Sequence, residues 1–398
     1  MSDSFAIGGR SVGPGAKPLV IAELSGNHNG SLERALRIVE AAARAGADAI
    51  KLQTYTADSM TLNIRSAGFV VTEPTSLWHG RSLYELYREA ATPWEWHEPL
   101  FQRCRELGML YFSTPFDAAA VDLLESLHVP CYKIASFENV DHALIRRVAA
   151  TGKPIIMSTG MATLAELDEA VRCARDAGCA QLMLLKCTSS YPASPTNSHL
   201  RSIPCLRDLF HCQVGLSDHT LGIGAAVAAV ALGAVAIEKH VTDSRAEGGV
   251  DAAFSLEPAE LAALVVETER AWQALGEVRL EPTAQEQSSR QFRRSLYVVA
   301  DLQPGDRLTP ENLRAIRPGY GLAPKYLDTL LGKTVARHVV RGTPASWNLL
   351  GSVDASSACL PEPIFPPRKA EGVQCSDATQ ATDNAAGREN GPSPKGCA

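Results

Sequence analysis

The sequence predicts an α/β fold, a (β/α)8 barrel of parallel strands followed by a small β-rich domain. Three observations lead to this prediction. Short apolar runs recur through the first 280 residues, and segments with helical spacing separate them. The runs are almost continuously apolar, as strands covered on both faces must be. Eight such runs are present, and eight parallel strands close a barrel. An open doubly wound sheet is the alternative on pattern alone.

The expected strands lie at residues 18–24, 49–54, 109–115, 131–136, 154–159, 181–187, 213–219 and 234–241. The segments between them follow helical rules. SLERALRIVEAAARAGAD begins at Ser31, which predicts an N-cap, and its helical pattern ends at a glycine. The same reasoning predicts helices in TPWEWHEPLFQRCRELG, TLAELDEAVRCARDAG and EPAELAALVVETERAWQALG.

The chain changes character near residue 280. We expect the barrel in residues 1–280, a polar linker at 281–290 and a second domain at 291–351. That domain has short β-rich runs and a Pro-Gly-Asp turn. Residues 352–398 are poor in apolar side chains and rich in Ala, Ser, Pro, Asn and Asp, which predicts a disordered tail.

Composition excludes several classes of function. The formal net charge of −6 argues against a nucleic-acid partner, which requires a basic surface. The amino terminus has no basic region followed by an apolar run, so we expect no signal peptide. The longest apolar stretch, 223–237, is too short to span a membrane. Ten cysteines without a CxxC pair indicate reduced thiols and a cytoplasmic protein.

Polar side chains gather where the expected strands end, which is where barrel enzymes carry their chemistry. Lys51 and Gln53 are two residues apart and therefore share one face of a strand. A single lysine there could equally pack against a glutamate. Polar ends on all eight strands favour a site, because lysines and hydroxyls suit a phosphate and a carboxylate. The group comprises Glu23, Lys51, Gln53, Ser113, Thr114, Lys133, Ser136, Glu138, Ser158, Thr159, Lys186, Ser217, Asp218, His219, Glu238, Lys239 and His240.

Two histidines end consecutive strands. His219 and His240 can therefore lie side by side, and two imidazoles suit a divalent metal that keeps positions open for water and substrate. Either histidine could instead be a hydrogen-bonded barrel residue.

These residues resemble the sialic acid synthase family. The matching stretches are IAELSGNHNG, AIKLQT, FSTPFD, YKIASFE, IMSTGM, KCTSSYP, GLSDHT, EKHVT and FSLEP. RRSLYVVADLQPGDRLTPENLRAIRPGYG resembles the family's antifreeze-like (SAF) domain, and the likeness covers about 18–350. Within the family, FVVTEPTSLWHGRSLYELYREAATPWEWH and RPGYGLAPKY are most similar to the pseudaminic acid synthases.

The resemblance implies an enzyme that condenses phosphoenolpyruvate with an open-chain amino sugar, here 2,4-diacetamido-2,4,6-trideoxy-altrose. It also implies roles residue by residue. Phosphoenolpyruvate would be held by Lys51, Thr114, Lys133, Ser136, Ser158 and Ser217, and the sugar by Gln53, Tyr191 and Asp251. His219 and His240 would hold manganese or magnesium, and Glu23 and Glu138 are the candidate acid–base carboxylates.

The resemblance further implies a homodimer with exchanged C-terminal domains. Arg317, in the turn RPGYG, would reach the active site of the partner subunit. From the residues alone, Arg317 could also be a solvated loop charge.

Three other functions stay open. The chain could make N-acetylneuraminate or legionaminate instead. It could be an aldolase in which Lys133 or Lys186 forms a Schiff base. It could also be a non-catalytic glycan-binding protein that uses its C-terminal domain.

Overall fold

The structure is a computed structural model that describes residues 5–350. The chain divides after Glu277 into two compact units. The predicted tail, 352–398, lies outside the described residues, and the exact domain bounds stay predictions. Within the described chain, no helix is both long enough and apolar enough to cross a bilayer.

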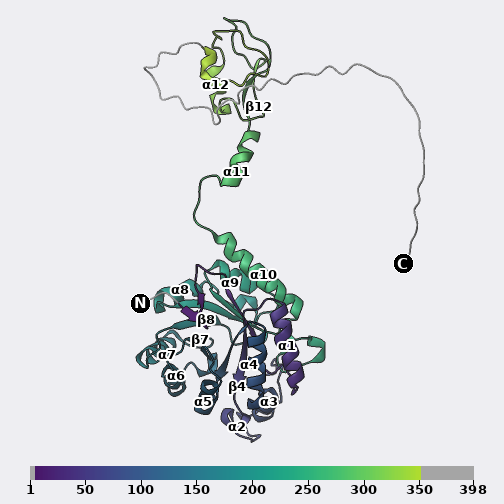
Figure 1. Ribbon diagram of the computed structural model, residues 1–398, viewed down its shortest axis with the longest axis vertical. Coiled ribbons are helices and arrows are strands. Elements are labelled where there is room, and N and C mark those ends of the chain that lie inside the picture. Colours follow the sequence, from purple (N-terminus) through teal and green to yellow (C-terminus); the bar gives the residue numbers. More distant parts are fainter. Residues whose placement is uncertain (1–4, 351–398) are drawn as a thin grey trace, which may run out of the picture. The chain divides into compact units, whose positions relative to one another are not determined.

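The first unit is a closed barrel of eight parallel strands, as predicted, with helices around them in Figure 1. The strands follow the chain in order, and β10 closes the ring against β3. They are β3 (Leu19–Glu23), β4 (Ala49–Thr54), β5 (Leu110–Pro115), β6 (Tyr132–Ile134), β7 (Ile155–Ser158), β8 (Leu182–Cys187), β9 (Gln213–Asp218) and β10 (Ala236–His240).

Several of the surrounding helices begin at a polar cap. The Ser31 side chain accepts a hydrogen bond from the Arg34 amide, as its sequence position predicts, and Thr163 with Glu166 forms a reciprocal capping box. The helices are α1 (Leu32–Arg44), α4 (His97–Glu106), α5 (Ala118–Ser126), α6 (His142–Ala149), α7 (Leu164–Asp176), α8 (Ser202–Phe210), α9 (Gly224–Ala231) and α10 (Pro258–Leu275).

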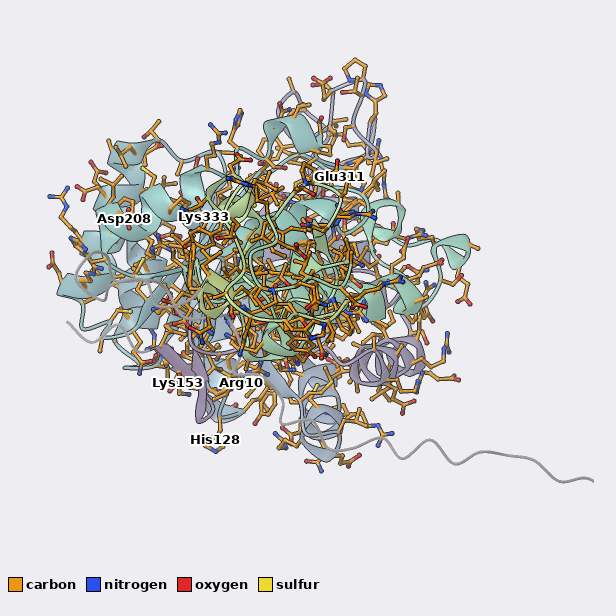
Figure 2. The ribbon with its side chains drawn as sticks, turned by 90° about the horizontal axis from the view of Figure 1, so that it is seen from above. Arg10, His128, Lys153, Asp208, Glu311 and Lys333 are labelled. Carbon is orange, nitrogen blue, oxygen red and sulfur yellow. The ribbon has the colours of Figure 1, made fainter. Side chains whose placement is uncertain are left out.

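A short hairpin closes the base of the barrel, the end at which the strands begin. Strands β1 (Phe5–Ile7) and β2 (Arg10–Val12) pair around Gly8 and Gly9, both of which have positive φ, as a tight hairpin turn requires. Phe5, Ile7 and Val12 pack with interior residues of the barrel strands. Side chains of this end, among them Arg10 and Lys153, are labelled on one side of Figure 2.

The crossover from β4 to α4 is longer than the others and carries two additional helices, α2 (Ala57–Met60) and α3 (Leu83–Ala90). Neither was among the helices predicted above. Val70 pairs with Ser82 between them in an antiparallel bridge. This crossover borders the site described below.

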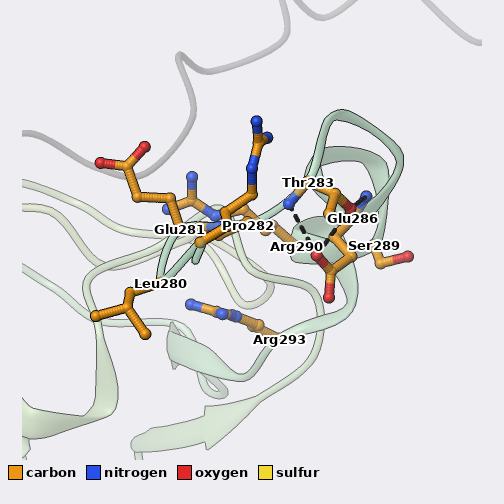
Figure 3. Close-up of a pocket in the computed structure, with 9 residues that line it drawn as sticks. Leu280, Glu281, Pro282, Thr283, Glu286, Ser289, Arg290 and Arg293 are labelled. Carbon is orange, nitrogen blue, oxygen red and sulfur yellow. Dashed lines mark hydrogen bonds between the residues drawn. The ribbon is translucent and has the colours of Figure 1, made fainter. Parts of the chain in front are cut away.

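The second unit has its own apolar core around β11 (Ser295–Val298) and β12 (Leu313–Ile316), which pair antiparallel, with α12 (Leu327–Leu330). The preceding segment contains α11 (Ala284–Ser289), where the Thr283 amide donates to Glu286 at 2.8 Å. Figure 3 shows the hollow beside this helix, lined by residues between Arg279 and Arg293.

Candidate active site

The carboxyl ends of the strands bring most of the predicted residues together at the mouth of the barrel, the end opposite the hairpin. Parallel register places Glu23 opposite Lys51 on one side and opposite His240 on the other. Ser217 lies opposite Glu238, and Thr114 opposite Gln53. The register therefore aligns these side chains in neighbouring strands.

Four charged residues form the floor of the mouth, which we call the charged floor: Glu23, Lys51, Lys133 and Glu238. All are buried, and Lys51 forms an ion pair with Glu23. Glu238 lies between the two lysines, 3.7 Å from Lys51 Nζ and 3.8 Å from Lys133 Nζ. Two lysines and two glutamates thus share one desolvated space, where charge interactions are strong.

Burial and ion pairing shift the pKa values of the two glutamates of the charged floor in opposite directions. Burial raises the pKa of Glu23, an effect that the adjacent Lys51 only partly offsets. Burial also acts to raise the pKa of Glu238, but Lys133 and Lys51 outweigh it and the net pKa is lowered. Glu238 is therefore the counter-ion of the two lysines, and Glu23 is the carboxyl that more readily holds a proton.

The pKa values of the two lysines of the charged floor are also shifted in opposite directions. Burial lowers the pKa of Lys133. It also acts to lower the pKa of Lys51, but Glu23 and Glu238 more than compensate, and the net pKa is raised. Burial likewise lowers the pKa of Lys186. Lys133 and Lys186 thus meet one requirement of a Schiff-base lysine, a lowered pKa.

Hydroxyl groups surround these charges. Lys133 Nζ donates to Ser158 Oγ at 2.6 Å, and Lys51 Nζ donates to Thr114 Oγ1 at 3.3 Å. Ser217 donates to a carboxylate oxygen of Glu238 at 3.3 Å. Ser136 Oγ accepts from the Gly160 amide at 3.1 Å. Four predicted hydroxyls therefore lie at the mouth, three of them bonded to the charged floor or to its lysines.

The two predicted metal ligands are neighbours, with ring centroids 5.4 Å apart. His219 Nδ1 is 2.9 Å from the Thr188 carbonyl. A carbonyl only accepts, so Nδ1 carries the proton and Nε2 is left to bind a metal. His240 Nδ1 is buried without a hydrogen-bond partner in the described chain, and Asp251 Oδ2 lies 3.5 Å away. An orphaned imidazole nitrogen of this kind fits a metal site.

The protonation of the pair bears on this fit. Burial lowers the pKa of His240 well below its usual value, so the ring is neutral at neutral pH and one ring nitrogen has a lone pair available to a metal. Burial acts the same way on His219, but Cys187 and the Thr188 carbonyl more than offset it and the net pKa is raised. A proton therefore competes with a metal for Nε2 of His219 more strongly than it would in an unperturbed histidine. No group of three or more His, Cys, Asp or Glu in residues 5–350 could hold a metal unaided.

A cavity of about 410 Å³ opens beside the histidines. The predicted residues Gln53, Glu138, Tyr191, His240 and Asp251 line it. Burial raises the pKa of Glu138 to about 7, although Lys133 acts to lower it. Its Oε2 is buried and has no hydrogen-bond partner among the residues described. Glu138 can therefore exchange a proton near neutral pH, the property that a general acid or base needs.

Arg317 is the one predicted site residue that does not belong to the barrel unit. It is exposed and follows β12 in the second unit. Its predicted reach to the active site of the partner subunit stays a prediction.

Some residues at the mouth were not assigned a role from the sequence. Glu238 contacts both lysines of the floor, and its signal was available, because Glu238 and His240 are two apart as Lys51 and Gln53 are. Ser25 donates to Asp251 Oδ2. Trp78 lines the cavity from the β4–α4 crossover, and no pattern in the sequence predicted that contact.

Comparisons with known proteins agree with this geometry. Residues 38–279 match the NeuB family model and residues 293–351 match the SAF domain model. Pseudaminic acid synthase of Campylobacter jejuni is 43% identical over 82% of this chain and 94% of that protein. N,N'-diacetyllegionaminic acid synthase of the same species is 33% identical over 81% of this chain and 97% of that protein. The crystal structure of N-acetylneuraminic acid synthetase from Leptospira borgpetersenii, in complex with citrate, superposes with a TM-score of 0.64 at 35% identity, over 73% of this chain and 95% of that one.

Proposed function

This chain belongs to the NeuB family and is an enzyme of that family, and from that premise we propose the reaction. The enzyme condenses phosphoenolpyruvate with 2,4-diacetamido-2,4,6-trideoxy-altrose and water, and it releases pseudaminic acid and phosphate. The observation that carries the proposal is the charged floor with its hydroxyls, which adjoins a cavity of sugar size beside two histidines. The degree of identity to pseudaminic acid synthases supports this sugar over the legionaminate and neuraminate precursors.

Phosphoenolpyruvate is assigned to the charged floor. Lys51 and Lys133 bind its phosphate and carboxylate, and Thr114, Ser136, Ser158 and Ser217 donate further hydrogen bonds. The floor alone is nearly neutral, because two glutamates balance two lysines. A proton on Glu23 lowers the cost of bringing an anion there, since burial already raises the pKa of Glu23.

The metal would be manganese or magnesium, and His219 and His240 would hold it. When bound, it supplies Lewis-acid polarisation of the sugar's aldehyde oxygen. Asp251, 3.5 Å from His240 Nδ1 and bonded to Ser25, faces the same space and orients the sugar together with Gln53 and Tyr191.

The bond changes follow from this arrangement. C3 of phosphoenolpyruvate attacks the aldehyde carbon, whose oxygen takes up a proton, and the π electrons of C2–C3 form the new bond. Water adds to the cationic C2 and gives up a proton. The new C2 hydroxyl then loses its proton and becomes the keto oxygen as phosphate leaves with cleavage of the C2–O bond. We assign Glu138 to accept the proton from water, because its pKa of about 7 leaves it partly ionised at neutral pH. Holding both substrates at attack distance supplies up to ~7–11 kcal/mol.

A Schiff-base aldolase is the second candidate, because burial lowers the pKa of Lys133 and Lys186. One experiment separates the two. Phosphate release from phosphoenolpyruvate is followed with the 6-deoxy diacetamido sugar, with N-acetylmannosamine, and with neither, before and after chelation. The proposal requires release that depends on the 6-deoxy sugar and on metal. Borohydride trapping of pyruvate on the protein, with activity indifferent to EDTA, would favour the aldolase.

We further propose that the enzyme works in the cytoplasm as a homodimer with exchanged C-terminal units. Support for the exchange is the match of residues 293–351 to the SAF domain, together with the exposed position of Arg317 in that unit. A guanidinium brought over the mouth would add the positive charge that the nearly neutral floor lacks.

A further inference from the structure

The cavity has one wall that the proposed mechanism does not use. Its polar side carries Gln53, Glu138, His240 and Asp251. The remaining lining is mainly apolar, and a single stretch of chain, the β4–α4 crossover, supplies most of it. Of the crossover residues that line the cavity, those that follow Tyr55 form what we call the crossover wall: Met60, Val71, Trp78, Leu83, Leu86, Tyr87 and Ala90.

Helix α3 turns its apolar face to this cavity. Leu83, Leu86, Tyr87 and Ala90 follow the spacing i, i+3, i+4, i+7, and all four line it. The opposite face is polar, and there Glu85 pairs with Arg65. An amphipathic helix ordinarily packs its apolar stripe against protein. Here Tyr87 does pack edge-on against Tyr55, but the stripe also borders an open space of about 410 Å³, so that part of it is available to a ligand.

Backbone hydrogen bonds hold the wall in shape. Val71 and Arg81 are joined at 2.9 Å, Gly80 donates to the Val71 carbonyl at 2.8 Å, and Leu83 donates to the Phe69 carbonyl at 3.0 Å. The side chain of Trp78 fastens the segment across the mouth, because its Nε1–H donates to the Val250 carbonyl at 3.0 Å. Val250 directly precedes Asp251, so Trp78 connects the apolar wall to the polar side of the cavity.

We propose that the crossover wall determines sugar specificity by receiving the methyl groups of a deoxy, N-acetylated sugar and disfavouring a hydroxyl in the same place. This inference rests on the proposed function. The transfer of a methyl group from water to such a wall is favourable. A hydroxyl group placed against Val71, Leu83 and Leu86 loses its hydrogen bonds to water and finds no replacement on these three side chains.

The size of the expected discrimination between a 6-deoxy sugar and its 6-hydroxy analogue can be estimated. An apolar pocket rejects an analogue with one added hydroxyl by roughly 10²-fold at most. We therefore expect the wild-type enzyme to prefer the 6-deoxy diacetamido sugar over its 6-hydroxy analogue by roughly 10–100-fold in kcat/KM. The Michaelis constant for phosphoenolpyruvate should be the same with both sugars, because the charged floor binds that substrate.

The test compares two wall variants of the full-length enzyme. Val71→Thr adds a hydroxyl at nearly constant volume to a half-buried position, so it should fold as the wild type does. Leu83→Asn adds a larger polar group to the first turn of α3. Both give a sugar hydroxyl a partner. The ratio of kcat/KM for the 6-deoxy sugar to that for its 6-hydroxy analogue should fall by about threefold in Val71→Thr and by about tenfold in Leu83→Asn. Both changes lie within the range of one hydrogen bond.

Leu62→Asn is the matched control. Leu62 belongs to the same crossover, is 60% exposed and does not line the cavity. The Leu62→Asn variant should prefer the 6-deoxy sugar to the same extent as the wild type. An unchanged preference in both wall variants, or the same change in the control, would overturn the wall assignment while leaving the reaction intact. Absence of phosphate release with either sugar in the wild type would overturn the proposed function and this inference with it.

Discussion

The base and the mouth of the barrel are built from the same rows of inward-facing residues, but these residues are apolar at the base and charged or polar at the mouth. In β3 the row runs Leu19, Ile21 and then Glu23; in β10 it runs Ala236, Glu238 and His240. The base members join the hairpin in an apolar core. The mouth members form the charged floor and the histidine pair. In both strands the interior is thus divided between a part that stabilises the fold and a part that forms the site.

This division lets one region be altered without the other. Substitutions at the mouth should change turnover and leave folding nearly intact, since the base core is untouched. Substitutions at the base should do the reverse. The predictions below test that separation, in order of their expected effect on turnover.

The largest loss of turnover is expected for Glu138→Gln. The change keeps size and polarity but removes the proton acceptor, so kcat should fall by ~10²–10⁴-fold. In the wild type, kcat should rise with pH through about 7, because the ionised form of Glu138 is the active one and burial raises its pKa to that value. The variant should lose this rise in a pH–rate profile. A profile that keeps its inflection would assign the proton transfer elsewhere.

The histidine pair should come next. His219→Ala and His240→Ala should each lower turnover by roughly 10²-fold or more, because even partners of metal ligands contribute ~10–100-fold. Bound manganese, measured in the purified protein, should fall in parallel. His128 is exposed at the base and has a positive φ that asparagine tolerates. His128→Asn should therefore change neither quantity, and full activity after exhaustive chelation would contradict the metal assignment.

A heterodimer of two inactive variants should recover part of the wild-type activity. Arg317→Ala and Lys133→Met should each be nearly inactive. After joint unfolding and refolding, heterodimers should contain one site with both residues intact if the C-terminal units exchange. Activity should then return to a substantial fraction of the wild-type value. Heterodimers that form but stay inactive would show that Arg317 acts within its own chain or has no role in turnover.

The smallest effect on turnover is expected at the base. Phe112 is fully buried among the interior residues below Thr114. Phe112→Ala should lower the free energy of unfolding by about 3–5 kcal/mol, because it opens a cavity in a packed core. Turnover per folded molecule should stay within about twofold. Thermal unfolding and active-site titration measure the two quantities, and a large loss of turnover in the folded fraction would show that the two ends are coupled.

The same comparison explains what the sequence could predict. The barrel strands were found to within about two residues, because continuous apolar runs separated by helical spacing are a strong local signal. The period of two placed Lys51 and Gln53 together, and both reach Glu23. The same argument applied to Glu238 and His240 would have given Glu238, already part of the strand-end group, a role in the predicted site.

Other features depended on signals that were weak or not local. The strands of the base hairpin are only three residues long, although the Gly8–Gly9 pair between them is a hairpin turn signal. The apolar spacing of α3 was present in the sequence, but no local rule says whether such a face meets protein or a cavity. Trp78 contacts Tyr191 and Val250, which are more than a hundred residues away in the sequence.

The measurement that tests the central claim most directly is the affinity for phosphoenolpyruvate of two lysine variants from opposite ends of the barrel. Lys133 lies in the charged floor, whereas Lys153 precedes β7 at the base and pairs with Glu125 at 2.6 Å. By calorimetry, Lys133→Met should bind phosphoenolpyruvate roughly 10–100-fold more weakly, since hydrogen bonds to charged groups contribute ~1.5–3 kcal/mol. Lys153→Met should bind it as the wild type does. Equal losses in both variants, or wild-type affinity in Lys133→Met, would contradict a phosphoenolpyruvate site at the mouth.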